Sequence, residues 1–351
     1  MDKAAIADRP VSPSLNRLWL PGALCLLLLG LVTVSLSLGK YPVSVYEILL
    51  FFRQQVTGAA ALGPERYDLL RNILWEIRAP RIAAAVLIGA ALSTSGAAFQ
   101  SMFINPLVSP GLLGVLPGAS FGAALGMLLS RGWFGVQFCC FAGGLLAVGI
   151  AIGIARLYRG DRLLMLILGG IISGSLFTSL LSIVKYLADP YDTLPAIVYW
   201  LMGGLSMTDS HTVLWISIPV LSGIAGLLLM ARYLNVLSMG DEEARSLGVN
   251  VSLIRFWLIF FATVISALTV VVGGLIGWVG LIIPHIGRML VGPDNRTLLP
   301  VSALLGALYL VLVDDVSRLL LDIEIPLGII TALIGIPFFI LVLKNARKGW
   351  G

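Results

Sequence analysis

Long, uninterrupted apolar stretches recur along the whole chain, and they constrain its fold more than any other feature. Each is about 20 residues long, which is the length that an α-helix needs to cross the hydrocarbon core of a membrane. The stretches lack the alternating pattern of a transmembrane β-strand. Because backbone N–H and C=O groups in lipid must be paired within the protein, the stretches predict an all-α membrane bundle. About ten transmembrane helices are expected, at residues 17–38, 81–104, 111–130, 133–155, 164–186, 212–231, 254–273, 280–291, 298–318 and 326–343.

The composition agrees with an integral membrane protein. Hydrophobic residues make up 58% of the 351 residues and charged residues 12%, whereas soluble domains have roughly 45–50% and about 25%. The first apolar stretch is longer than the core of a signal peptide and lacks a clean cleavage site, so we expect a membrane anchor there. No low-complexity linker divides the chain. Residues 1–351 are therefore expected to form a single transmembrane domain.

The positions of the basic residues indicate how the helices are oriented. If the N-terminus is cytoplasmic, most of the 23 lysines and arginines lie in inner connections, and the largest outer group lies in the connection 39–81. The positive-inside rule therefore predicts that both termini are cytoplasmic. On this interpretation the net charge of +5 reflects topology and contact with the lipid bilayer, and no nucleic-acid partner is expected.

Candidate catalytic and metal-binding residues are few. The sequence has no Gly-x-x-x-x-Gly-Lys-Ser/Thr motif, whose backbone would cradle phosphates, so the chain is not expected to be an enzyme that hydrolyses a nucleotide by itself. His211 and His285, like Cys25, Cys139 and Cys140, lack the spacing of metal ligands and are interpreted as packing residues. No catalytic residue and no metal site are predicted.

The acidic residues bear on how transport could be driven. A secondary transporter usually places an ionisable side chain near the middle of the membrane to bind its coupling ion. Here every Asp and Glu falls in a predicted connection or at the end of a span: Asp189 and Asp192 follow the fifth span, and Asp314 and Asp315 close the ninth. This distribution weakens the ion-coupled interpretation and favours a partner protein as the energy source, although backbone carbonyls could still bind sodium.

One short polar segment, Met239–Asn250, interrupts the apolar chain with three consecutive acids. Asp241 can cap a short helix, and Glu242 and Glu243 complement the positive end of its dipole. Arg245 suits its last turn, and Gly248 suits a left-handed stop. The segment therefore predicts two helical turns on the cytoplasmic side.

Two interpretations of this segment remain open. Charge clusters are usually solvated surface, and a loop helix would satisfy that description. Alternatively, Ala244, Leu247 and Val249 form a small apolar face beside the charges. Such a face could dock into a groove on another protein.

The segment Gly240–Gly248 resembles the Gly-Glu-x-x-Ala-Arg-x-Leu-Gly coupling segment of permease subunits of type II ATP-binding-cassette importers, which carry iron chelates, haem and vitamin B12. Asp241 stands where that family usually has Glu. Further stretches resemble family motifs in the family order, namely residues 77–81, 95–100, 105–114, 199–204, 277–288 and 326–338. Each motif is weak alone, whereas the ordered set is highly specific.

The resemblance implies a homodimer of ten-helix subunits in the bacterial inner membrane. It also implies two partner ATPase subunits that hold ATP and Mg²⁺, and an external substrate-binding protein; the chain itself would bind no cofactor directly. The coupling helices are expected at about 236–252. The ATPase-coupling residues would be Gly240, Asp241, Glu242, Glu243, Ala244, Arg245, Leu247 and Gly248.

The resemblance assigns roles to two further sets of residues. Arg78, Arg81 and Arg318 match outward arginines that meet acidic residues of the binding protein, a role that suits the rigid guanidinium fork; the alternative is ordinary interfacial positioning. A helix-breaking turn matches an inner gate beside the translocation path, and its residues are Asn105, Pro106 and Leu107; the alternative is an ordinary packing role. A second gate loop, at 159–164, lacks the small hydroxylated residues of the family.

The cargo remains open at the level of sequence. Iron siderophore, haem and cobalamin are the first candidates, and the oxyanions molybdate and tungstate are the alternative within the same family. An ion-coupled secondary transporter and a channel-like or structural membrane protein are the alternatives outside it.

Overall fold

A computed structural model describes residues 16–130, 132–158 and 161–346 of the chain. The predicted all-α class is confirmed, because most of the described residues are helical and no strand occurs among them. The elements are α1 (Asn16–Ser37), α2 (Val45–Thr57), α3 (Pro64–Arg71), the π-helical η1 (Asn72–Arg78), α4 (Ala79–Met102), the 3-10 turn η2 (Pro110–Leu113), α5 (Val115–Leu128), α6 (Trp133–Leu157), α7 (Arg162–Leu187), α8 (Thr193–Leu201), α9 (Ser210–Leu229), α10 (Ala231–Leu237), α11 (Asp241–Ser246), α12 (Val251–Gly273), α13 (Val279–Val291), α14 (Asn295–Leu319) and α15 (Leu327–Ala346).

The apolar helices match the predicted spans one by one. Seven are long and apolar enough to cross a membrane. Three shorter apolar helices, in α5, α13 and α15, occupy the positions of the third, eighth and tenth predicted spans. The predicted cytoplasmic location of both termini concerns residues 1–15 and 347–351, which lie outside the described part of the chain.

The second span begins earlier than the sequence predicted. Residues 64–102 form one long helix, in which α3, η1 and α4 follow one another without a break. At the junction the Ala79 N–H donates to the Leu74 carbonyl, five residues earlier. This wider turn accommodates Pro80, whose ring in a regular α-helix would press on the carbonyl of the preceding turn.

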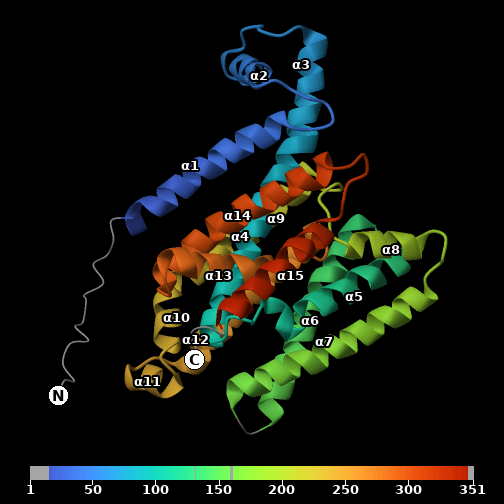
Figure 1. Cartoon of the computed structure of the whole chain (residues 1–351). Coiled ribbons are helices and arrows are strands. Elements are labelled where there is room, and N and C mark those ends of the chain that lie inside the picture. The colour runs from blue at the N-terminus through green and yellow to red at the C-terminus, as the bar shows by residue number, and fades with distance from the viewer. Residues whose placement is uncertain (1–15, 131, 159–160, 347–351) are drawn as a thin grey trace.

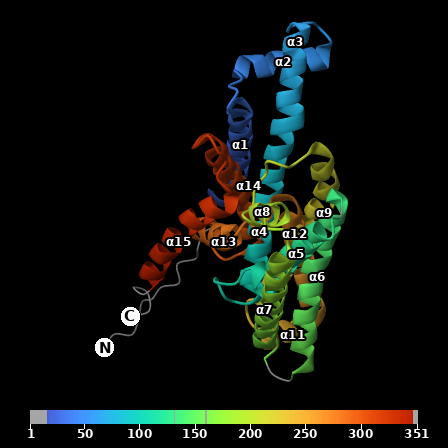
Figure 2. The same cartoon turned by 90° about the vertical axis from the view of Figure 1, so that its right-hand side faces the viewer.

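The helix α4 lies at the centre of the fold and packs on α9, α12, α13 and α14 (Figures 1 and 2). Its contact with α14 is between backbones. A Cβ atom on Gly89 would lie 2.1 Å from the Gly306 carbonyl oxygen, and one on Gly306 would lie 2.2 Å from the Gly89 carbonyl oxygen. Because small residues allow such close approach, α4 and α14 form a tight pair in the middle of the bundle.

The connection 39–81 is a folded helical hairpin rather than a simple loop. The helices α2 and α3 project at one end of the molecule, and α11 lies at the opposite end (Figure 1). Phe51 and Leu70 are buried in a small core of the hairpin. The Ser44 Oγ accepts from the Glu47 N–H at 3.2 Å, and Glu47 Oε2 accepts from the Ser44 N–H at 3.1 Å, which is a complete capping box. The Glu47 carboxylate also pairs with Arg66, and this hydrogen bond lowers the pKa of Glu47.

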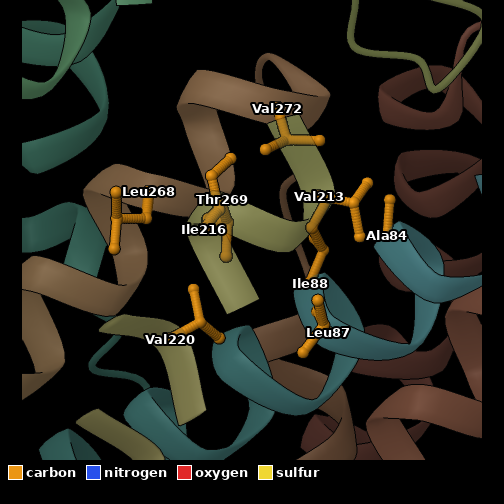
Figure 3. A pocket seen from close by; sticks show the side chains of 9 residues that line it. All are labelled: Ala84, Leu87, Ile88, Val213, Ile216, Val220, Leu268, Thr269 and Val272. Atoms are coloured by element: carbon orange, nitrogen blue, oxygen red, sulfur yellow. The ribbon is translucent and has the colours of Figure 1, made fainter. Parts of the chain in front are cut away.

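A cavity between α4, α9 and α12 is too small to bind a solute. Its volume is about 10 Å³, which is roughly the space of one water molecule. The Thr269 hydroxyl in its wall already donates to the Ser266 carbonyl at 2.7 Å. Figure 3 shows the lining, which consists of Ala84, Leu87, Ile88, Val213, Ile216, Val220, Leu268, Thr269 and Val272.

Candidate functional site: coupling segment, gate loop and outer arginines

The predicted coupling segment forms a helix, α11, between two glycines with left-handed backbones. Gly240 occupies the N-cap with φ of +118°, so the prediction that Asp241 caps the helix is wrong. Asp241 is instead the first helical residue. The predicted stop at Gly248 is confirmed, because its φ is +78°. Both conformations strain a residue that carries a Cβ atom, which explains glycine at each end.

Asp241 has a structural role that its place in the motif did not reveal. Arg255 in α12 donates from Nη1 to Asp241 Oδ2 at 2.8 Å and from Nη2 to Asp241 Oδ1 at 2.5 Å. Arg255 is buried, whereas the Asp241 side chain is about a third exposed. The bidentate pair therefore fastens the start of α11 to the first turns of α12.

The other charges of α11 point away from the protein. Glu242, Glu243 and Arg245 are exposed. Among the described residues, the side chains of Glu242 and Arg245 make no hydrogen bond or ion pair. Charged groups in this position are available to a partner.

The predicted apolar face of the segment is divided between inside and outside. Ala244 is fully buried, and Val249 packs against the same core cluster. Leu247 alone of the three is exposed, at 61%. The prediction that all three would form one docking face is therefore wrong, because α11 needs Ala244 and Val249 to anchor itself.

A polar network behind α10 was not predicted. Asn235 in α10 accepts from the Asn295 side-chain amide at 2.8 Å, and it donates to Asp294 at 2.6 Å. Asn295 at the start of α14 also accepts from the Ser101 hydroxyl at 2.7 Å. Ser101 lies in the last turn of α4. The network therefore joins α10, just before α11, to the end of α4, where the predicted gate loop begins.

The gate loop has the sharp turn that its sequence predicted. Asn105 accepts from the Leu107 N–H through Oδ1 at 2.9 Å, and its own N–H donates to the Gln100 carbonyl at 3.0 Å. Ile104 has φ of +51°. Pro106 and Leu107 are exposed. The side chains that the turn presents are therefore apolar.

A hollow lies beside this loop, between η2 and α7. Its volume is about 450 Å³. The η2 backbone approaches α7 closely, since a Cβ atom on Gly170 would lie 2.1 Å from the Leu112 carbonyl oxygen. Its lining contains hydroxyl groups but no charged side chain, and consists of Gly111, Leu112, Gly170, Ile171, Gly174, Ser175, Thr178 and Ser179. The second predicted gate loop, 159–164, falls partly outside the described residues, because positions 159–160 are not described.

The three outer arginines are not free at the surface, contrary to the outward position expected for them. Arg78, Arg81 and Arg318 are exposed by only 5%, 8% and 8%. Arg78 donates to backbone carbonyls at the end of α1 and just beyond it, namely those of Leu36, Ser37 and Tyr41. Its guanidinium group therefore holds α1 against η1.

Arg81 and Arg318 form ion pairs with carboxylates of the same chain. Arg81 Nε lies 3.0 Å from both Asp314 carboxylate oxygens, and Arg81 Nη1 lies 2.8 Å from Glu324 Oε1. Arg318 pairs with Asp315, and its Nη2 donates to the Ser35 hydroxyl at 2.8 Å. These contacts tie α1, α4 and α14 together. Docking by these arginines stays a prediction.

The two aspartates of this cluster lie near the end of α14, as the sequence predicted, but they are buried among arginines rather than exposed at a membrane surface. In the described residues, this cluster included, no group of three His, Cys, Asp or Glu side chains is placed to hold a metal ion. Cys25, Cys139 and Cys140 are free thiols. The candidate sites that the sequence predicted are α11, the turn at Asn105–Leu107 with the hollow near it, and the three arginines; their roles stay predictions.

Comparison with known proteins supplies the family. The model of the FecCD transport family matches residues 26–345. The molybdate import permease MolB of Haemophilus influenzae is 39% identical over 327 residues, covering 93% of this chain and 96% of MolB. The vitamin B12 import permease BtuC of Salmonella typhi is 38% identical over 279 residues, covering 78% and 84%. A solved structure described as an inward-facing metal-chelate type ABC transporter has a TM-score of 0.80 and 36% identity, covering 93% of this chain and 99% of that one. The chain therefore belongs to the FecCD transport family.

Proposed function

We propose that this chain is the transmembrane permease subunit of an ATP-driven importer that carries a metal chelate into the cytoplasm of a bacterium. It works in the inner membrane as a homodimer with two ATPase subunits and an external binding protein. ATP and Mg²⁺ act on the ATPase subunits, and the permease binds no cofactor of its own. Membership of the FecCD family supports this assignment.

The observation that carries the proposal is the form of α11. Its backbone is fixed by Gly240 and Gly248, its first residue is fastened to α12 through Arg255, and its remaining charges are exposed. A helix that is anchored on one face and charged on the other transmits a push from a docked partner to the bundle. The Asn235 and Asn295 network gives that push a contiguous connection to α4 and the gate loop.

The path for the solute is proposed to run past the gate loop and the hollow beside α7. Leu107 and Pro106 would close it from the inside. The neutral hydroxyl lining suits a pore that binds its cargo weakly, since affinity would reside in the external binding protein. A rigid-body movement of the two subunits would open the path on alternate sides.

Docking of the binding protein at the outer end is proposed to use the arginine cluster. Glu324 is the exposed member of that cluster, with a third of its side chain accessible. An acidic residue of the binding protein could replace Glu324 as the partner of Arg81 without stripping Arg81 of its buried partner Asp314. Docking at this cluster would then be sensitive to salt.

A metal chelate is the proposed cargo because vitamin B12 is the cargo named for one relative and a metal chelate for the solved structure. Molybdate is the second candidate, since MolB covers 93% of this chain at 39% identity. The test is calorimetric titration of the cognate binding protein with iron siderophore, haem, cobalamin and molybdate. Submicromolar binding of one chelate supports the first candidate, and binding of molybdate alone replaces it with the second.

The ATPase partnership is tested separately by co-purification. The permease, expressed with its neighbouring genes, should emerge with a nucleotide-binding subunit in equal amount. A permease that purifies alone, and that accumulates solute in response to a sodium or proton gradient, would favour the ion-coupled alternative.

A further inference from the structure

We propose that a cavity between α6, α7 and α12 binds the headgroup and upper acyl chain of an anionic phospholipid, next to the coupling helix. The cavity has a volume of about 630 Å³. It lies between three helices that are long and apolar enough to cross a membrane. Its lining consists of Ile152, Ala155, Arg156, Tyr158, Leu163, Leu166, Ser252, Arg255, Phe256 and Ile259.

The charge of the lining favours an anion. Two arginines, Arg156 and Arg255, are among the lining residues, and no carboxylate is. Asp241, which is not a lining residue, pairs with Arg255. Arg255 is 7% exposed, and its Nε has no hydrogen-bond partner among the residues that the structure describes. Ser252 lies in the first turn of α12, where the helix dipole also favours negative charge. A phosphate group in the cavity would therefore meet a net positive wall.

The shape and polarity of the lining favour a lipid over a free anion. Most of the lining is aliphatic or aromatic, and an apolar side chain next to it, Leu157, is 79% exposed. Arg156 lies at the last turn of α6, where a basic side chain reaches the headgroup layer while the helix below contacts acyl chains. Basic pockets between membrane helices on the cytoplasmic side are a known type of lipid site.

A lipid in this cavity would affect how α11 is attached to α12. Arg255 is both a wall of the cavity and the partner that fastens α11 to α12. A phosphate group that binds the Arg255 guanidinium competes with Asp241 for the same guanidinium group. The lipid would therefore tune how firmly α11 is held. This inference depends on the proposed orientation, with α11 at the cytoplasmic face, but not on the identity of the cargo.

The test is native mass spectrometry of the purified permease–ATPase complex with added phosphatidylglycerol or phosphatidylcholine. Wild type should bind phosphatidylglycerol more tightly than phosphatidylcholine. Arg156→Gln should weaken phosphatidylglycerol binding about fivefold, the factor expected for one arginine near an anionic headgroup. Arg296→Gln is the matched control, because Arg296 is an exposed arginine at the start of α14, near α10, and does not line the cavity. It should bind as wild type.

A second variant and a second ligand distinguish the contribution of the cavity's shape to lipid binding from the contribution of its charge. Ala155→Phe fills the cavity without changing its charge and should also weaken phosphatidylglycerol binding. Glycerol phosphate, which has the headgroup but no acyl chain, should not displace the lipid at millimolar concentration. The proposal is overturned if Arg156→Gln binds phosphatidylglycerol like wild type, or if glycerol phosphate displaces the lipid. It is also overturned if the permease alone binds the lipid but the permease–ATPase complex does not, because the ATPase subunits would then fill the cavity. Failure of lipid binding leaves co-purification with the ATPase unaffected, so the two proposals fail separately.

Discussion

The two ends of this molecule carry charged clusters that look alike in the sequence and differ in the structure. At the proposed outer end, Arg81 and Arg318 are buried and paired with Asp314 and Asp315 of the same chain. At the proposed inner end, Glu242 and Arg245 are exposed on α11. Burial therefore separates charges that hold the bundle together from charges that are available to a partner. The outer cluster is expected to govern stability, and the inner cluster association.

The largest expected effect follows from removing a buried charge at the outer end. Asp314→Asn should lower the free energy of unfolding by about 3–5 kcal/mol, because Arg81 loses its buried partner. Thermal unfolding of the detergent-solubilised protein measures the loss. Asp68→Asn, which neutralises an exposed aspartate on α3, is the control and should change little. An Asp314→Asn variant as stable as wild type would show that the outer cluster is not structural.

Reversing the exposed charges of α11 should weaken association with the ATPase subunits and have little effect on stability. The double variant Glu242→Arg and Arg245→Glu should weaken association with the ATPase subunits about tenfold or more, or at least about 1.4 kcal/mol. Its membrane insertion should match wild type and its unfolding temperature should change only slightly, because neither side chain has a partner within the described protein and only the small interaction with the α11 dipole is reversed. Quantitative pull-down of the ATPase measures the effect. Unchanged association would remove the coupling role from these residues.

Asp241 shares features with both the buried, structural charges and the exposed charges, because it belongs to α11 but pairs with a buried arginine. Asp241→Asn should loosen the segment by about 1 kcal/mol, less than a fully buried pair would lose, since Asp241 is partly exposed. Hydrogen exchange of the backbone amides at 241–249 should accelerate about fivefold. Glu242→Gln in the same turn should leave exchange unchanged. Equal exchange in the two variants would mean that Arg255 does not anchor α11.

The smallest effect concerns the outer hairpin and depends on pH. The pKa of Glu47 is lowered in the folded protein by the hydrogen bond from Arg66. Its contribution to stability is therefore present above the ordinary glutamate pKa and is lost as the pH falls through the lower, folded value. The difference in unfolding temperature between wild type and Arg66→Gln should shrink between pH 7 and pH 3. A difference that stays constant with pH would exclude this ion pair as its cause.

Local signals predicted the fold well because each acts over one helix. The ten apolar stretches correspond to ten apolar helices in the described part of the chain, and Gly248 follows α11 in the left-handed conformation that its position predicted. Pro80 misled the prediction of the second span, since a π-turn absorbs the proline and the helix continues back to Pro64.

Long-range pairings could not be predicted, because no local pattern encodes them. Arg81 and Asp314 are 233 residues apart in the chain, and Ser101 and Asn295 are 194 apart. Without those contacts, the motif at Arg78 and Arg81 predicted outward arginines that meet the binding protein, or ordinary interfacial positioning, rather than buried ion pairs. The same limit hid the division of the α11 apolar face, since Ala244 and Leu247 are equally apolar and only packing distinguishes them.

The central claim is that work from a separate ATPase, delivered through α11, drives uptake. The most direct measurement is solute accumulation in proteoliposomes that contain the permease, with the binding protein outside. Two conditions are varied independently. The first is the presence of the ATPase subunits with internal ATP, and the second is a sodium or proton gradient. The account predicts accumulation only when ATPase and ATP are present, whatever the gradient, and its loss in the variant with Glu242 and Arg245 reversed. Accumulation by the permease alone under an ion gradient would contradict it.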